Sequence, residues 1–136
     1  MSKVSQKFFK TAGGPLATDS GEAIACNKKV IFSVGAITNG TTPPIDFEGM
    51  EVVVTSNTNN RQAFVAGLDN CGNQIFFKIA GGNSGLEESI AKAVVANDNY
   101  AFVTGSISEE VTTDFNRKGI FRMDTYPVLN ECASFP

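Results

Sequence analysis

The residues able to act in catalysis are few, and their types and spacing do not form a catalytic set. The 136-residue chain has no histidine, so it lacks the base that activates the nucleophile in Ser-His-Asp hydrolases and in Cys-His enzymes. Carboxylates stand side by side at Glu87-Glu88 and at Glu109-Glu110. Neighbouring residues of a strand point to opposite faces of a sheet, so such pairs do not converge on one substrate. We therefore expect solvated surface carboxylates and a protein that is not an enzyme.

Metal ions and cofactors are not expected either. The three cysteines, Cys26, Cys71 and Cys132, include no C-x-x-C pair, and without histidine they do not make a zinc site. The glycine pairs at 13–14 and 81–82 lack the lysine and the following helix of a phosphate-binding loop. They therefore predict strand connections that need the conformational freedom of glycine.

The cysteines also bear on the redox state of the chain. An odd number in a chain without a secretory signal favours free thiols. A bond between two chains is the alternative, with Cys71 as the candidate, because 69–73 reads DNCGN and predicts an exposed turn. Asp69 and Asn73 would suit a calcium loop, but its other oxygen ligands and its closing glutamate are missing, so a side-chain-capped turn is expected.

Two tyrosines with polar neighbours are the best candidates for a ligand site. Tyr100 follows Asp98 and Asn99, and Tyr126 is the second tyrosine of the chain. An aromatic face flanked by amide and carboxylate groups suits a carbohydrate, so these four residues form a hypothetical lectin-like site. The alternative is that the tyrosines are structural, as tyrosines at strand edges commonly are.

Composition excludes several partners. Charged residues make up 18% of the chain, and the net charge of −3 comes with scattered basic residues. Nucleic-acid binding is therefore not expected. No apolar run approaches the roughly 18 residues of a membrane helix, and no signal peptide is visible, so neither membrane insertion nor secretion by a signal is expected. We expect synthesis as a soluble cytoplasmic protein, which could still join an extracellular or viral assembly.

An internal repeat is the most informative feature of the chain. Five segments recur in the same order at separations of 64–70 residues. They are 8–10 with 76–78, 13–14 with 81–82, 20–25 with 84–91, 30–37 with 100–107, and 46–47 with 114–115. We therefore expect a single domain over 1–136, with one repeat at about 7–69 and a second at about 74–136. The first repeat carries about a dozen extra residues near 50–61.

Alternating and β-branched patterns predict four short strands in each repeat. The expected strands are 8–12, 22–26, 29–37 and 62–68, then 74–79, 89–96, 100–107 and 119–123. The five-residue connection 69–73 suits a β-hairpin. Residues 51–55 could add an edge strand, and the tail 128–135 a further strand or an arm.

Two further expectations concern side chains within these strands. Residues 86–95 have apolar residues at helical spacing, but the short matching segment of the first repeat favours a strand. The mid-strand aromatics are expected in the core between sheets. These aromatics are Phe32, Phe64, Phe102 and Phe121.

The run 62–107 resembles the blades of a bacterial β-propeller repeat family. The resemblance rests on Ala63-Phe64-Val65, Gly72-Asn73, Gly81-Gly82 and the run from Tyr100 to Gly105. It departs from the family in having no tryptophan, with Phe76-Phe77 where tryptophan is common. The resemblance implies an all-β protein of two propeller-blade-like, four-stranded antiparallel repeats of the seven-bladed type, and it implies little about activity.

Two blades alone would leave both flanking sheet faces exposed to water, whereas propellers close with typically about 4 to 8 blades. We therefore expect a homo-oligomer, either a ring or an open stack, with a β-sandwich as the alternative fold. The expected function is a non-enzymatic, self-assembling binding or structural module with a carbohydrate or protein ligand. The alternative is a structural subunit of a virion, a filament or a surface appendage.

Overall fold

The computed structural model describes residues 6–40, 42–54, 60–80, 88–107 and 120–124, without the side chains of 107 and 120–124. All regular secondary structure in these ranges is β-strand, which confirms the all-β expectation. The strands are β1 (Ser20–Cys26), β2 (Ile31–Ile37), β3 (Gln62–Leu68), β4 (Gln74–Ala80), β5 (Ser89–Ala96), β6 (Tyr100–Ile107) and β7 (Ile120–Asp124).

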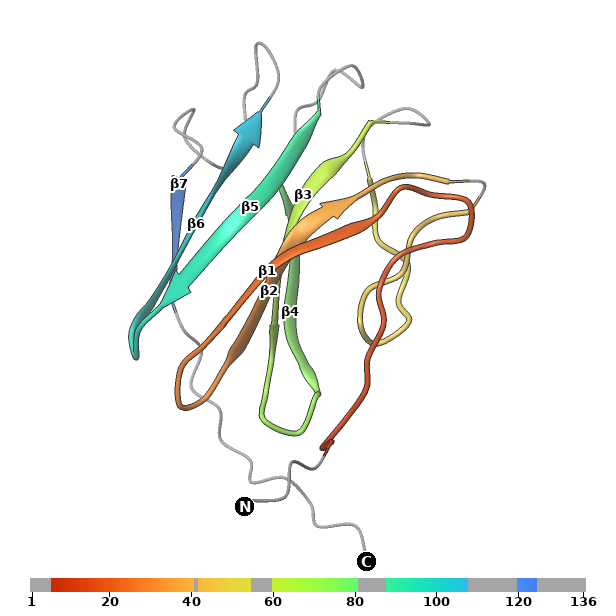
Figure 1. Ribbon diagram of the computed structural model, residues 1–136. Helices are drawn as coiled ribbons and strands as arrows, with labels where there is room; N and C mark the ends of the chain where they lie inside the picture. Colours follow the sequence, from red (N-terminus) through yellow and green to blue (C-terminus); the bar gives the residue numbers. More distant parts are fainter. Residues whose placement is uncertain (1–5, 41, 55–59, 81–87, 108–119, 125–136) are drawn as a thin grey trace, which may run out of the picture.

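The strands form two antiparallel sheets (Figure 1). The first sheet has the order β1-β2-β3-β4, and the second has the order β5-β6-β7. The central strand β3, of sequence QAFVAGL, is buried along its whole length because both of its faces are covered. Small, branched and aromatic side chains suit such a strand.

The sheets pack face to face. The first sheet contributes Phe32, Val34 and Val65 to the shared core, and the second sheet contributes Val94 and Val103. All five are at most 7% exposed, and each fully buried side chain of this size contributes about 1.5–3 kcal/mol. This arrangement is common to a pair of blades and to a sandwich, so the packing alone does not separate the two.

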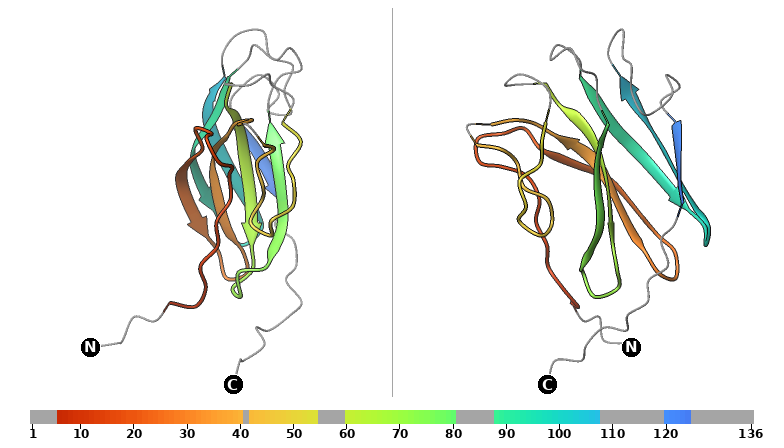
Figure 2. Two further views of the ribbon diagram at one scale, coloured as in Figure 1. Left: turned by 90° about the vertical axis from the view of Figure 1, so that its right-hand side faces the viewer. Right: turned by 180° about the vertical axis from the view of Figure 1, so that it is seen from behind.

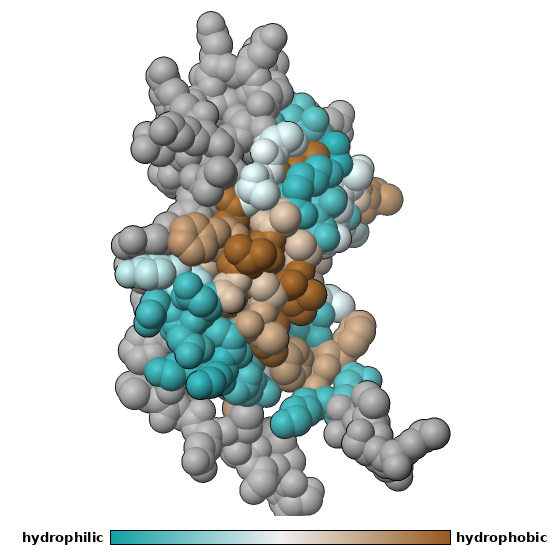
Figure 3. Space-filling model, turned by 60° about the vertical axis from the view of Figure 1, so that its left-hand side comes forward, coloured by the Kyte–Doolittle hydropathy of each residue, from teal (hydrophilic) through white to brown (hydrophobic). Residues whose placement is uncertain are grey.

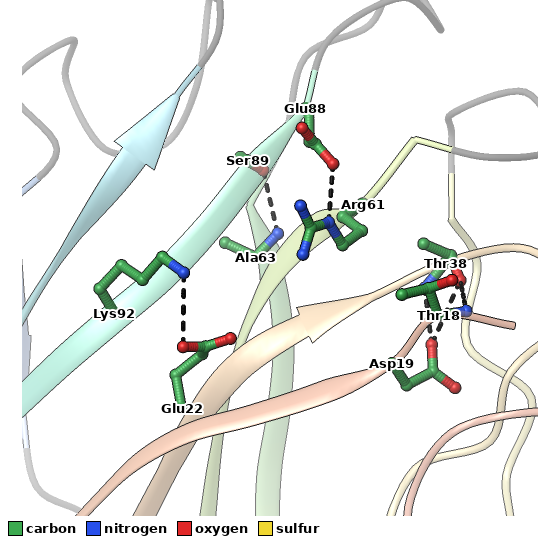
Figure 4. Close-up of polar contacts among 9 residues, drawn as sticks. All are labelled: Thr18, Asp19, Glu22, Thr38, Arg61, Ala63, Glu88, Ser89 and Lys92. Carbon is green, nitrogen blue, oxygen red and sulfur yellow. Dashed lines mark hydrogen bonds and ion pairs between the residues drawn. The ribbon is translucent and has the colours of Figure 1, made fainter.

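Polar contacts fix the start of β5 against the first sheet (Figure 4). The hydroxyl of the buried Ser89 accepts a hydrogen bond from the Ala63 N–H at 2.9 Å and donates one to the Ala80 carbonyl at 2.7 Å. Beside it, Arg61 Nε lies 2.7 Å from Glu88 Oε1. These bonds satisfy groups that burial would otherwise leave unpaired, and they set the crossing of β5 over β3.

A long loop, whose described residues 42–54 we call the covering loop, lies over the opposite face of the first sheet (Figure 2). Phe47 and Val52 pack on a second apolar cluster that includes Phe64 and Val54, and the Phe47 ring lies 6.2 Å from the Phe77 ring. The edge strand expected at 51–55 is wrong for its described part, which makes a single bridge from Ile45 to Glu51. The residues at 52–54 cover a sheet face instead of extending a ladder.

The strand expected at 8–12 is also wrong. This segment runs alongside the first sheet without joining a described strand, and the neighbouring Gly13 makes an isolated bridge to Ile45. The Phe8 ring lies against Gly72, where an added Cβ would come within 2.6 Å of the ring, while Phe9 is 78% exposed. The match between 8–10 and 76–78 therefore reflects composition rather than strand pairing.

The other strand predictions hold where the structure describes them. The hairpin of β3 and β4 forms as expected, and it places β4 in the first sheet rather than at the start of the second. The described part of 86–95 is strand and not helix. The tail at 128–135 lies outside the described residues.

The expectation for the four phenylalanines holds only in part. Phe32 lies in the core between the sheets, but Phe64 packs on the opposite face under the loop, and Phe102 is 41% exposed on the outer face of the second sheet. The side chain of Phe121 lies outside the described part. Mid-strand position alone did not determine which face each ring occupies.

Candidate functional site

The hairpins β1–β2 and β5–β6 are structural equivalents. Ala23 pairs with Val34 in the first hairpin and Ala93 pairs with Thr104 in the second, so both partners are shifted by 70 residues (93 − 23 = 104 − 34 = 70). The same shift relates every pair of the β1–β2 ladder to a pair of the β5–β6 ladder, from Ser20–Ala36 with Ile90–Ser106 to Cys26–Ile31 with Ala96–Ala101. The expected match of 30–37 with 100–107 is thus realised in space, while 20–25 corresponds to 90–95 and not to 84–91.

Each hairpin contains a β-bulge faced by a glycine. Gly35 lies opposite the bulge of β1, and Gly105 lies opposite the bulge of β5. A Cβ on Gly35 would stand 1.9 Å from the Ser20 carbonyl oxygen, and a Cβ on Gly105 would stand 2.0 Å from the Ile90 carbonyl oxygen. Only glycine permits this backbone approach, so both hairpins share the same local constraint.

The turns of the two hairpins are equivalent too. Asn27 Oδ1 accepts hydrogen bonds from the N–H groups of Lys29 and Val30, each at 2.8 Å. Its counterpart Asn97 accepts from the N–H groups two and three residues further on, at 2.9 and 2.8 Å. Asparagine suits both places because its side-chain oxygen accepts the hydrogen bonds that cap its own turn.

Equivalent positions of the two hairpins lie against each other. Asn27 Nδ2 donates to the Asn97 carbonyl at 2.9 Å. Lys92 Nζ lies 3.4 Å from Glu22 Oε2, and Lys28 Nζ lies 3.8 Å from Asp98 Oδ2. One hairpin is therefore stacked on the other with equivalent residues aligned.

This stacking brings opposite faces of equivalent sheets into contact. Phe32 is fully buried between the sheets, whereas its counterpart Phe102 points away from the first sheet and is 41% exposed. Val94 is 7% exposed in the same core, whereas its counterpart Ile24 is 71% exposed on the other flank. One flank of the protein, on the second sheet, therefore exposes the equivalent of the face that the first sheet buries. The other flank, on the first sheet, exposes the equivalent of the face that the second sheet buries.

The outer face of the second sheet is the candidate surface with two neighbouring exposed apolar side chains. Figure 3 turns this side of the molecule forward and shows apolar residues gathered in its middle, bordered by hydrophilic ones. Val95 is 64% exposed on it, and Phe102 is its cross-strand partner. We call this surface, defined by Val95, Phe102 and the half-buried Tyr100, the outer apolar face.

Three of the four residues expected to bind a ligand lie at the end of this face. Asp98 and Asn99 form the β5–β6 turn, and Tyr100 begins β6 with its ring 6.3 Å from that of Phe102, edge to face. Asp98 faces Lys28, and the Asn99 N–H is bound to the turn asparagine. Tyr126 lies outside the described residues.

The buried carboxylates serve structural roles. Burial opposes ionisation of Asp69, but hydrogen bonds from the Asn73 side chain and from the N–H groups of Asn73 and Cys71 outweigh it, and the pKa of Asp69 falls below its usual value. This is the expected side-chain-capped turn. In the covering loop the pKa of Asp46 is lowered in the same way, since bonds from Gln74, Met50 and Glu48 overcome desolvation.

A cavity of about 330 Å³ lies between the segment 10–13 and the outer face of β1 and β2. Asp19 is its acidic residue, and its oxygens already accept hydrogen bonds from the N–H groups of Gly14 and Thr38. In the described ranges no three histidine, cysteine, aspartate or glutamate side chains are grouped to hold a metal ion.

The cysteines differ from one another. Cys26 is exposed with a free thiol, as expected, whereas Cys71 is disulfide-bonded, so the expectation of a free thiol there is wrong. Cys132 lies outside the described residues. Spacing carried no signal for either state, because no motif joins the three.

No family model, curated protein or solved structure matches this chain. The described residues include no helix of the length and apolarity that crossing a membrane requires.

Proposed function

We propose that the protein is a non-enzymatic structural subunit that assembles through its outer apolar face. The observation that carries the proposal is the exposure of Val95 and Phe102, at 64% and 41%, as cross-strand neighbours on one sheet face near the β5–β6 turn. Single exposed apolar residues are normal on a surface, but a contiguous apolar sheet face marks a place where another protein packs.

The equivalence of the hairpins strengthens this proposal. Phe32 is the residue of the first sheet that corresponds to Phe102. It is fully buried, because the second sheet packs on it. Near the turn the outer apolar face thus carries apolar residues where the buried face of the first sheet does, while Thr104 and Ser106 stand where that face has Val34 and Ala36. A partner sheet would extend the stack as a propeller-like ring or as an open array, the latter suiting a filament or a particle.

Size-exclusion chromatography with light scattering tests the proposal. We expect the wild-type chain to elute at a discrete multiple of 14.4 kDa or as an open-ended polymer. The double variant Val95→Ser/Phe102→Ser is expected to be monomeric. Val53→Ser is the matched control, because Val53 is 83% exposed on the covering loop and lies outside this face. A wild-type monomer at tens of micromolar would contradict the proposal.

A carbohydrate ligand is the second candidate. The edge-to-face pair of Tyr100 and Phe102 presents an aromatic surface at the end of the hairpin whose turn carries Asp98, and a sugar ring can bind to aromatic and carboxylate groups of this kind. A glycan array tests it: binding that Tyr100→Ala abolishes would support a lectin-like function. An array without any bound glycan would remove it.

A further inference from the structure

We propose that copies of this chain associate head to tail, with the outer apolar face of one copy receiving the exposed side of the β1–β2 hairpin of the next. This inference rests on the proposed function, and it adds the identity of the partner surface. The surface is defined by Ile24 and Cys26 of β1 and by Ile31 of β2, and we call it the hairpin face.

The internal packing provides the template for this association. Within one chain, the face of the second sheet that carries Val94 lies on the face of the first sheet that carries Phe32. Ile24 occupies in the first sheet the position that Val94 occupies in the second, and Phe102 likewise corresponds to Phe32. A second copy that repeats the internal step therefore lays its Ile24 on the Phe102 of the first.

The charged residues along the stacked hairpins are arranged so that their contacts within one chain can be repeated between two copies. Along the stack within one chain, Glu22 is followed by Lys92, and Lys28 is followed by Asp98. If the next copy follows in the same orientation, its Glu22 comes to the Lys92 of the first copy, and its Lys28 comes to Asp98. Each charge then has an opposite charge on both sides, which favours this orientation and register.

The coverage of the first sheet explains why the contact is limited to the hairpin. The covering loop packs over Phe64 and Phe77, and the segment 10–13 lies opposite the first half of β1. The half of β1 nearest the turn stays open, with Ile24 71% exposed. The hairpin face is therefore the part of this flank on which another copy can pack.

Complementing variants test the orientation. Val95→Asp removes the outer apolar face, and Ile24→Asp removes the hairpin face, while each leaves the other surface intact. Both side chains are largely exposed, so both variants are expected to keep the wild-type circular dichroism spectrum. In a head-to-tail assembly each variant alone is monomeric, and an equimolar mixture forms a 1:1 pair of twice 14.4 kDa.

Other outcomes separate the two proposals. If the wild type assembles, Ile24→Asp assembles like it and mixing adds no new species, the second sheets pair symmetrically, and the head-to-tail inference is overturned while the proposed function stands. If the wild type is monomeric, both are overturned. Val53→Asp is the charge-matched control and is expected to assemble like the wild type.

Discussion

Glu22 and Lys92 occupy the same position in two stacked hairpins, and their charged groups lie 3.4 Å apart between the sheets (Figure 4). Each is the extra residue of a β-bulge at an edge strand, between Gly21 and Ala23 in β1 and between Ala91 and Ala93 in β5. The bulges thus direct both side chains to the same side of the stack. The contact between Glu22 and Lys92 therefore shows that equivalent residues of the two hairpins lie beside each other.

Reversing the sign of this pair should have a small and salt-sensitive effect. Glu22→Lys places two ammonium groups together and is expected to lower the free energy of unfolding only slightly, because exposed ion pairs contribute little. The double variant Glu22→Lys/Lys92→Glu should recover the wild-type value. Urea unfolding at low and at high salt measures this, and a loss that persists at high salt would contradict an electrostatic origin.

The glycines opposite the bulges should not tolerate even a methyl group. Gly35→Ala would press a Cβ against the Ser20 carbonyl at 1.9 Å, a backbone atom held by the ladder. We expect a loss of about 1–3 kcal/mol in the free energy of unfolding, with the same result for Gly105→Ala. Gly21→Ala is the control, since a methyl group there would meet no described atom within 4 Å beyond its chain neighbours. Equal stability of Gly21→Ala and Gly35→Ala would contradict the close approach.

The sequence was a good guide to local structure. Alternation and β-branched residues located β3, β5 and β6 to the residue, because these segments are short, apolar and bounded by turn residues. It failed at 8–12, where Phe8 lies against the turn residue Gly72 and Phe9 is exposed, and at 51–54, where Val52 and Val54 pack onto a sheet face instead of pairing with a strand. The apolar residues of a segment predict that it packs on the protein. They do not show whether it pairs with a neighbouring strand or lies over the face of a sheet.

The candidate surface was predicted less well than the strands. The match of 30–37 with 100–107 was visible in the sequence, and it implied that Phe32 and Phe102 are equivalent. Equivalent residues of stacked sheets, however, lie on faces with opposite surroundings, one inside and one outside. Which member is exposed depends on the stacking direction, and that follows from tertiary contacts such as the one between Asn27 and Asn97.

The Asp69 turn should make stability depend on pH in the acid range. The pKa of Asp69 is lowered in the folded state, so its contribution is complete above the unfolded value of about 4 and is lost as the pH falls through the folded value. Asp69→Ala removes the acceptor for the N–H groups of Cys71 and Asn73 and should cost about 1–3 kcal/mol at neutral pH.

The pH series is the decisive measurement for this turn. The difference in unfolding free energy between the wild type and Asp69→Ala should shrink as the pH is lowered below about 4, since the wild-type carboxylate is then protonated. Asp98→Ala in the β5–β6 turn is the control, because Asp98 is exposed and the turn is capped by Asn97 instead. A difference that stays constant from neutral to strongly acidic pH would show that the ionised carboxylate is not what stabilises the turn.

The two equivalent phenylalanines should separate folding from assembly. Phe32→Ala empties a fully buried position between the sheets and should lower the free energy of unfolding by about 3–5 kcal/mol. Phe102→Ala truncates a ring that is 41% exposed, so in dilute monomer its cost should be below about 1 kcal/mol. With rising protein concentration, however, the wild type should gain stability that Phe102→Ala does not gain, because association stabilises the folded chain by mass action. Melting temperatures of both proteins across a concentration series measure this, and parallel curves would show that Phe102 takes no part in association.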